Sequence, residues 1–376
     1  MMTPRERILA VYNGQTPDRV PYMLDLSHYY LHRFQKPWDL CNGYPEPDYG
    51  MIDFNRSMGA AFYMPNQAIF SKTQYVNDVK ASVQTRSVNG VPEIVWRYDT
   101  PLGSIERIRV WNKNTYSWPI KKWGVVTEKE VEILAYAMSS SRYTPLPKNY
   151  DAWADYVGDD GVVYLGAGYS AIGYLMSYWM GVENTIYAID DFEDVMAEAV
   201  HRINENILEQ VRIMASEFRA PVILMGDNFS SDVQPPSFFA QWSKDFYTKA
   251  IQIFHDHGKK VAVHVDGKQK GALAMLRDAG ADAIDAVTPG SVGRYTPSQA
   301  RAEAGDKLIL SGGIPNELWY AKYAAMEQFE DAVKQWLALK DLSPALIAAA
   351  GDQVPPGAEE ARIRRMGELV EEYGYY

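Results

Sequence analysis

Short apolar runs, each closed by a polar residue or glycine and separated from the next by a helical stretch, constrain the fold most. In the second half of the chain the runs lie at 162–166, 222–225, 261–265, 283–287, 308–310 and 346–349. Each is nearly continuous rather than alternating, which indicates strands buried on both faces, as in a parallel sheet covered by helices. Two earlier runs, at 20–24 and 60–64, give eight candidate strands. The pattern predicts an α/β fold, a single (β/α)8 TIM barrel spanning residues 1–376.

One segment of the N-terminal half does not follow this rhythm. Around 81–112 the apolar residues alternate about the dipeptide Asn89-Gly90, the strongest short-range signal for a β-hairpin. This segment predicts an antiparallel β-meander inserted into the barrel. Elsewhere, Thr3 with Glu6 and Thr127 with Glu130 have the spacing of capping boxes, which predicts helices that begin just after each threonine.

Composition excludes several classes of protein. The chain has 37 Lys and Arg against 48 Asp and Glu, a net charge of −11, so we expect neither nucleic acid nor an anionic membrane as a partner. Its one cysteine, Cys41, excludes an intramolecular disulfide and a site with several thiolates. We expect a cytoplasmic protein, because no export signal and no apolar run long enough for a transmembrane helix is visible.

Polar residues follow the apolar runs at the positions where barrel strands would end. In a (β/α)8 barrel these ends converge on one mouth, where the active site lies. His264 and Asp266 are two residues apart on one strand, so both side chains could reach one ion or one substrate atom. Alternatively, Asp266 orients the imidazole or caps the next helix. The candidate acid–base residues are His264, Asp227, Asp25 and His28.

These candidates also have structural interpretations. Asp227 and Asp352 could form Asx-turns or helix caps instead of taking part in chemistry. Ser311, Gly312 and Gly313 could let the phosphate of a cofactor approach backbone N–H groups, although a tight turn after the strand explains the glycines equally well. Aromatic residues near strand ends could wall a pocket or belong to the core: Tyr29, Tyr30, Tyr169 and Trp242.

Several motifs resemble the uroporphyrinogen decarboxylase superfamily, which also contains the zinc-dependent corrinoid methyltransferases. They are TPRERILAVYNGQTPDRVP near the start, then HDHGKKVAVHVDGK, LRDAGADAID, KLILSGGIP and GDQVPPGAEEARIRRMGELVEEYG. The resemblance covers nearly the whole chain and implies a (β/α)8 barrel and a homodimer. The arginine-rich segment that holds the substrate in true decarboxylases is absent, since MLDLSHYYLHRF has no arginine before Arg33. The aspartate that they use at the second strand is also missing from AAFYMPNQ.

The resemblance also implies a metal site. The corrinoid methyltransferases bind zinc through a His-x-Cys pair and a later cysteine, and the matching positions here are His264, Asp266 and Asp352. One imidazole with two carboxylates is a harder donor set, which accepts Zn²⁺ and also suits Mn²⁺ or Fe²⁺. We therefore expect a divalent metal, zinc first, on these three residues.

Three functions remain open at this stage. We favour a metal-dependent methyltransferase that moves a methyl group from a small methylated donor, such as a methoxylated aromatic, to a corrinoid (cobalamin) carried by a separate protein. The alternative is a decarboxylase or other lyase acting on a carboxylated substrate, which needs a cation near His264, with Arg294 or Lys268 as candidates. The third is a barrel that binds a methylated compound or a corrinoid protein without turnover.

Overall fold

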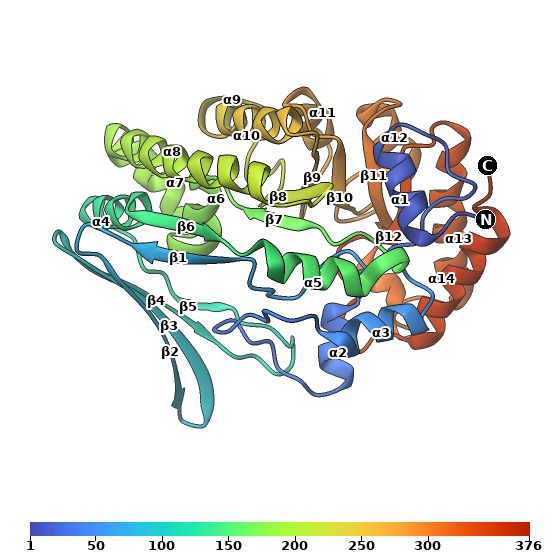
Figure 1. The fold of residues 1–376 in the computed structure, drawn as a ribbon, viewed down its shortest axis with the longest axis horizontal. Helices are drawn as coiled ribbons and strands as arrows, with labels where there is room; N and C mark the ends of the chain where they lie inside the picture. The colour runs from blue at the N-terminus through green and yellow to red at the C-terminus, as the bar shows by residue number, and fades with distance from the viewer.

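A six-stranded parallel sheet forms the centre of the computed structural model, which describes residues 1–376. The strand order is β12-β11-β10-β9-β8-β7, so each strand lies beside its neighbour in sequence (Figure 1). The strands are β7 (Leu165–Gly168), β8 (Val222–Phe229), β9 (Lys260–Val265), β10 (Ala283–Val287), β11 (Ile309–Ile314) and β12 (Leu346–Ala350). The predicted parallel α/β arrangement is therefore present.

The two earliest predicted strands are reduced to single bridges. Tyr22 forms a parallel bridge to Ala348 of β12, and Met23 forms one to Ala61. Phe62 in turn bridges Gly161, shortly before β7. These segments link the two ends of the sheet, but they are not regular strands. The prediction of eight continuous strands closed into a barrel is thus reproduced only in part.

Helices precede, connect and follow the strands (Figure 1). Those of the N-terminal half are α1 (Pro4–Tyr12), α2 (Ser27–Arg33), α3 (Tyr49–Ser57), α4 (Glu128–Ser139), α5 (Pro147–Val157), α6 (Ala171–Tyr174) and α7 (Val182–Asp191). The others are α8 (Glu193–Glu217), α9 (Pro236–Trp242), α10 (Lys244–Asp256), α11 (Ala272–Asp278), α12 (Pro297–Ala304), α13 (Met326–Leu337) and α14 (Glu360–Tyr373). None of them combines the length and apolar composition needed to span a bilayer.

Both predicted capping boxes are formed. The Thr3 hydroxyl accepts a hydrogen bond from the Glu6 amide at 3.2 Å, and the Glu6 carboxylate accepts one from the Thr3 amide at 2.7 Å. Thr127 and Glu130 repeat this exchange at the start of α4. These boxes satisfy amides that the first turn of a helix leaves without partners, so α1 and α4 begin where the sequence predicts.

A four-stranded antiparallel sheet occupies the segment around 81–112. Its strands are β2 (Lys80–Val88), β3 (Val91–Thr100), β4 (Gly103–Val110) and β5 (Ile120–Lys122), in that order. Val88 pairs with Val91 across the Asn89-Gly90 turn. The hairpin of β2 and β3 projects from the body of the molecule, and every residue of β2 is exposed (Figure 1). A separate pair, β1 (Ser71–Tyr75) with β6 (Ser141–Pro145), is also antiparallel.

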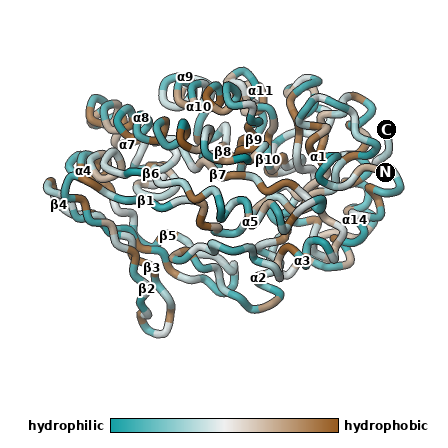
Figure 2. Tube along the Cα trace, viewed as in Figure 1, coloured by the Kyte–Doolittle hydropathy of each residue, from teal (hydrophilic) through white to brown (hydrophobic).

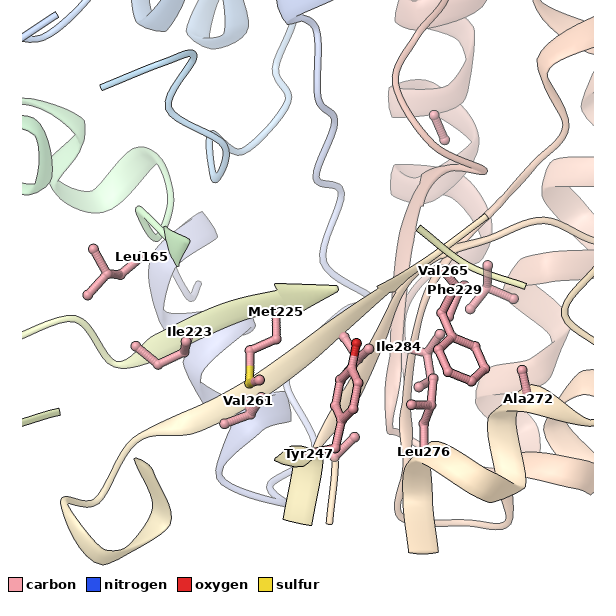
Figure 3. Close-up of a cluster of buried hydrophobic side chains, with 14 of the residues drawn as sticks. Leu165, Ile223, Met225, Phe229, Tyr247, Val261, Val265, Ala272, Leu276 and Ile284 are labelled. Carbon is pink, nitrogen blue, oxygen red and sulfur yellow. The ribbon is translucent and has the colours of Figure 1, made fainter. Parts of the chain in front are cut away.

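The larger of two hydrophobic clusters lies between the parallel sheet and the helices that pack on it. Figure 3 shows Tyr247 of α10 and Leu276 of α11 among buried side chains of β8, β9 and β10. Along α8 and α10 hydrophilic and hydrophobic residues alternate, as expected for helices with one buried face (Figure 2). Close packing of these buried side chains fixes the strands, so the side chains at the carboxyl ends of the strands are held in defined positions.

Candidate active site

The carboxyl ends of the strands surround a cavity of about 510 Å³. Its lining contains carboxylates, one imidazole, aromatic rings and amides, but no Lys or Arg side chain. The acidic and imidazole groups are Asp25, Asp266, Asp285, Asp352 and His264. Aromatic and amide side chains make up most of the remaining polar wall: Trp38, Tyr63, Tyr169, Tyr178, Asn66, Gln67, Asn228 and Gln353.

His264 lies between two carboxylates. Its Nδ1 atom is 2.9 Å from Oδ2 of Asp285, and its Nε2 atom is 3.9 Å from Oδ1 of Asp352. Asp285 is buried on β10, where it is the register partner of His264 on β9. A carboxylate that accepts the Nδ1 proton fixes the orientation of the ring and leaves Nε2 as the nitrogen available for chemistry.

The surroundings of His264 keep its ring protonated. Burial alone would lower the pKa of the imidazole, but the hydrogen bond to Asp285 and the charges of Asp352, Asp285 and Asp266 outweigh it and raise the pKa to about 9. At neutral pH the side chain is therefore an imidazolium that can donate a proton from Nε2.

Two carboxylates of the cavity bind protons more tightly than usual. Burial, together with nearby carboxylates, raises the pKa of Asp25 and of Asp352 to about 6 each. Asp25 is held by a hydrogen bond from the Ser27 amide to Oδ1, at 2.8 Å. At pH 7 Asp25 and Asp352 are both mostly ionised. The negative charges of the cavity therefore outnumber the one positive charge of His264. The cavity carries net negative charge and disfavours an anionic group near His264.

Irregular backbone at two strand ends shapes the cavity. The pairing register shifts in β8 between Met225 and Phe229 and in β10 between Ile284 and Val287. Each shift contains a residue with positive φ, Asn228 at 51° in β8 and Ala286 at 67° in β10. Such bulges re-aim neighbouring side chains and are frequent beside active sites. Here Asn228 and Asp285 both line the cavity.

Gly226 allows β8 to approach β9 closely at His264. A Cβ atom at this position would lie 2.8 Å from the Cβ of His264 and 2.9 Å from its carbonyl oxygen. Any larger side chain would therefore displace the histidine or the strand that carries it.

Two of the predicted acid–base residues do not line the cavity. Asp227 is buried and accepts hydrogen bonds from the Ser170 amide at 2.8 Å and the Ser170 hydroxyl at 2.6 Å. The Nε2 atom of His28 is 2.9 Å from the carbonyl oxygen of Tyr116, and the ring packs against Trp38. These hydrogen bonds give Asp227 and His28 partners outside the cavity lining, and the catalytic roles predicted for them stay predictions. Of the four predicted acid–base residues, His264 and Asp25 come together in the cavity.

The predicted phosphate-binding residues lie inside β11 and away from the cavity lining. A Cβ atom on Gly312 would lie 2.2 Å from the carbonyl oxygen of Val287, and one on Gly313 would lie 2.3 Å from the Trp336 ring. Ser311 is buried, and its hydroxyl has no hydrogen-bond partner. The close packing of β11 against β10 and α13 explains both glycines, and phosphate binding at these residues stays a prediction.

The predicted metal ligands share the cavity without converging. No three His, Cys, Asp or Glu side chains lie together in an arrangement that could hold a metal ion. Nδ1 of His264 bonds to Asp285, which leaves Nε2 for a ligand, and Oδ1 of Asp352 lies 3.9 Å from Nε2. The Asp266 carboxylate accepts a hydrogen bond from the Gly267 amide at 2.7 Å. As they stand, His264, Asp266 and Asp352 do not form a three-ligand metal site.

The sequence analysis did not identify Asp285 or the amide side chains that line the cavity, such as Asn66 and Gln67. The signal for Asp285 was present, since it is the one charged residue in the apolar run AIDAV, on the strand that follows the one with His264. Among the aromatic candidates Tyr169 lines the cavity, whereas Tyr29, Tyr30 and Trp242 do not. Asn66 and Gln67 follow an irregular segment, and no pattern in the sequence distinguishes them from ordinary loop residues.

The chain is similar to known proteins in fold and in sequence. No curated protein matches the chain. A methyltransferase from Methanosarcina mazei has a similar fold, with a TM-score of 0.64, 14% identity and coverage of 99% of each chain. A pneumococcal exo-β-D-N-acetylglucosaminidase is similar over 60% of this chain and 64% of its own, with 10% identity and a TM-score of 0.34. Residues 126–373, well over half of the chain, match the family described as uroporphyrinogen decarboxylase (URO-D).

The chain thus belongs to the uroporphyrinogen decarboxylase family.

Proposed function

We propose that the protein transfers a methyl group from a small methylated donor, such as a methoxylated aromatic, to a corrinoid carried by a separate protein. The observation that carries this proposal is the position of His264, between Asp285 and Asp352 in a cavity lined by no Lys or Arg. Removing a methyl group from an oxygen leaves an oxyanion, which a proton donor with a pKa near 9 can neutralise.

The residues of the cavity have distinct parts in this reaction. The carbon–oxygen bond of the donor breaks, its electron pair stays on the oxygen, and Nε2 of His264 delivers the proton that makes the product hydroxyl. Asp285 holds the ring through Nδ1 while this happens. Tyr63, Tyr169 and Trp38 line the cavity and would contact an aromatic donor. A reduced corrinoid supplies the nucleophile that accepts the methyl group.

Methyl transfer suits the cavity better than decarboxylation of a porphyrinogen with many carboxylates. Such a substrate requires cationic side chains, and the lining has none besides His264. Lys268 pairs with Asp232 at 2.8 Å, and neither Lys268 nor Arg294 lines the cavity. The lyase alternative therefore lacks the cations proposed for it. The Methanosarcina mazei protein of similar fold is a methyltransferase, which makes methyl transfer the reaction to try first.

A divalent metal stays a prediction. The donor arrangement described above does not fit one, and no step of the proposed reaction passes through a metal. Elemental analysis of the purified protein, before and after zinc supplementation, checks the prediction. About one metal per chain that is lost in His264→Ala would support it.

The test of the proposed function is methyl transfer from a panel of methoxylated aromatics to cob(I)alamin under reducing, oxygen-free conditions. We expect a demethylated phenol, with a matching change in the cobalamin spectrum, and a rate at least ~100-fold lower in His264→Gln. His255→Gln is the matched control, because His255 bonds to Asp282 outside the cavity. Carbon dioxide release from a carboxylated substrate without cobalamin would establish the lyase. Tight binding of a corrinoid protein without turnover of any donor would establish a binding barrel.

A further inference from the structure

A second cavity, of about 320 Å³, lies between the antiparallel sheet β2–β5 and the helices α4 and α8. One wall comes from the π-helical turn Leu175–Trp179, a rare conformation that is frequent at functional sites. Its polar lining consists of hydroxyl and amide groups and one guanidinium, that of Arg107, and contains no carboxylate. Tyr178 lines this cavity and the active-site cavity, so the two are neighbours.

Arg107 is buried without an anionic partner. Its exposed fraction is 7%, and no Asp or Glu lies within ion-pair distance of it. It donates one hydrogen bond, from Nη1 to the Tyr178 carbonyl oxygen at 3.4 Å, and its Nε has no partner. The Nε of Arg109, two residues further along β4, is also without a partner. Buried cations usually have an ion pair or a full set of hydrogen bonds, because desolvation is costly.

Another buried arginine of the same chain shows what a satisfied site looks like. Arg362, 1% exposed, donates from its Nη atoms to the carbonyl oxygens of Leu318 and Ala324 and from Nε to the Glu359 carboxylate. All three nitrogens of that guanidinium have partners within the protein. Arg107, 7% exposed, has one acceptor, for Nη1, and none for Nε or Nη2, which leaves donors for an acceptor from outside the chain.

Three aromatic rings lie close to the Arg107 guanidinium, and a single protein acceptor, the Tyr178 carbonyl oxygen, meets its N–H donors. The carbon Cζ lies 4.3 Å from the centre of the Trp96 ring, 5.0 Å from that of Tyr178 and 5.2 Å from that of Trp179. An aromatic ring attracts a cation that lies over the face of the ring. The N–H donors lie in the plane of the guanidinium, where they match the two oxygens of a carboxylate or phosphate. Burial and the charge of Arg109 lower the pKa of Arg107 only to about 10, so it stays charged at neutral pH.

We propose that this cavity binds a small oxyanion, a carboxylate or phosphate group, through the guanidinium edge of Arg107. The Tyr98 hydroxyl, which is bonded to Tyr75 at 2.9 Å, and the Gln210 amide, which donates to the Ser141 hydroxyl at 3.3 Å, also line this cavity. The aromatic walls suit a ring attached to the oxyanion. The anion is either part of the substrate, reaching past Tyr178, or a separate small molecule. The site stands on Arg107 and its surroundings alone, so it does not depend on the proposed methyl transfer.

Titration calorimetry with benzoate and with inorganic phosphate tests the site on the full chain. We expect saturable binding of one probe per chain to the wild type, weakened about tenfold or more in Arg107→Gln. Arg107→Lys keeps the charge but loses the two-pronged geometry, and we expect intermediate affinity. Arg97→Gln is the control, because Arg97 lies on the same sheet, half-exposed and paired with Asp99.

The two probes distinguish the sources of the anion. Tighter binding of benzoate would identify an organic carboxylate, and tighter binding of phosphate would identify a phosphate or phosphorylated compound. Saturable quenching of tryptophan fluorescence by benzoate in the wild type supports the site without any variant, because Trp96 and Trp179 line the cavity. Failure of both probes to bind the wild type at millimolar concentration would overturn the proposal. Equal affinity in the wild type and a folded Arg107→Gln variant would overturn it too.

Discussion

At the scale of single residues, the chemistry depends on how neighbouring charges set the state of His264. Asp285 contacts Nδ1 directly, and Asp352 faces Nε2 from a greater distance. Both carboxylates favour the imidazolium, which is why its pKa lies above the ordinary value of 6.5 despite burial. The same residue types in a solvated loop would leave the histidine mostly neutral at pH 7.

Replacing Asp285 by Asn is expected to move the activity profile to lower pH. The variant loses the negative charge that helps to raise the pKa of His264, and it keeps only a neutral amide oxygen as the acceptor for Nδ1. Methyl transfer that needs the protonated ring should fall off above about pH 9 in the wild type and at clearly lower pH in Asp285→Asn. The measurement is kcat/KM against pH. Asp232→Asn, at a half-exposed partner of Lys268, should leave the profile unchanged, and unchanged profiles in both variants would contradict the assignment.

Gly226→Ala tests the close approach of β8 to β9. The added methyl group would meet His264 at 2.8 Å, so we expect a loss of about 1–3 kcal/mol in the free energy of unfolding and a larger loss of activity. Urea unfolding and the methyl-transfer assay measure the two effects. Gly166→Ala is the matched control in the same cavity, because nothing lies within 4 Å of its added Cβ. A Gly226→Ala enzyme with wild-type stability and activity would show that the strands can separate freely here.

At the scale of helices and strands, local patterns in the sequence predicted most elements, and backbone irregularities account for the failures. The runs that became β8 to β12 are continuous and apolar, and the capping boxes depend on residues three apart, so both could be recognised locally. The runs at 20–24 and 60–64 contain or precede Pro21 and Pro65, which cannot donate a ladder hydrogen bond, and they form single bridges. The bulges that aim Asp285 and Asn228 arise from pairing between distant strands, which no local pattern reports.

The capping box of α4 gives a prediction at this scale. Thr127→Ala removes the hydroxyl that accepts from the Glu130 amide, and we expect the free energy of unfolding to fall by about 1 kcal/mol. Thr127→Ser keeps a hydroxyl at the same position and should retain most of the stability. Urea unfolding of both variants measures these free energies. Equal stability of the alanine and serine variants would mean that the cap contributes nothing measurable.

At the scale of the whole molecule, the resemblance seen in the sequence gave the family, whereas the arrangement of the site required the structure. The family assignment draws on motifs along the chain, and residues 126–373 match it. The metal set was inferred by matching positions to cysteines of relatives, and such matching carries no information on where side chains point. One domain and a homodimer stay predictions, which a single unfolding transition and sedimentation analysis check.

The cavity charges also predict how stability changes with pH. The folded pKa of His264, about 9, exceeds its ordinary value of 6.5, so its contribution to stability is complete below pH 6.5 and is lost as the pH rises through 9. We expect the free energy of unfolding to fall by roughly 1–3 kcal/mol between pH 6.5 and 9.5. The raised pKa values of Asp25 and Asp352 act in the same direction at lower pH, since their stabilising protons are lost as the pH rises through 6. Urea unfolding across this range should show a smaller decline in His264→Gln, and an equal decline would contradict the assignment.

Proton donation by His264 at neutral pH is the property on which the proposed chemistry depends most directly. It can be measured by titrating the ring Cε1–H resonance in proton NMR, with the signal identified by its absence from His264→Gln. We predict a midpoint near pH 9, clearly above 6.5, and therefore an imidazolium at pH 7. A midpoint at or below 6.5 would mean a neutral ring at pH 7, and His264 could not then be the acid that completes methyl transfer.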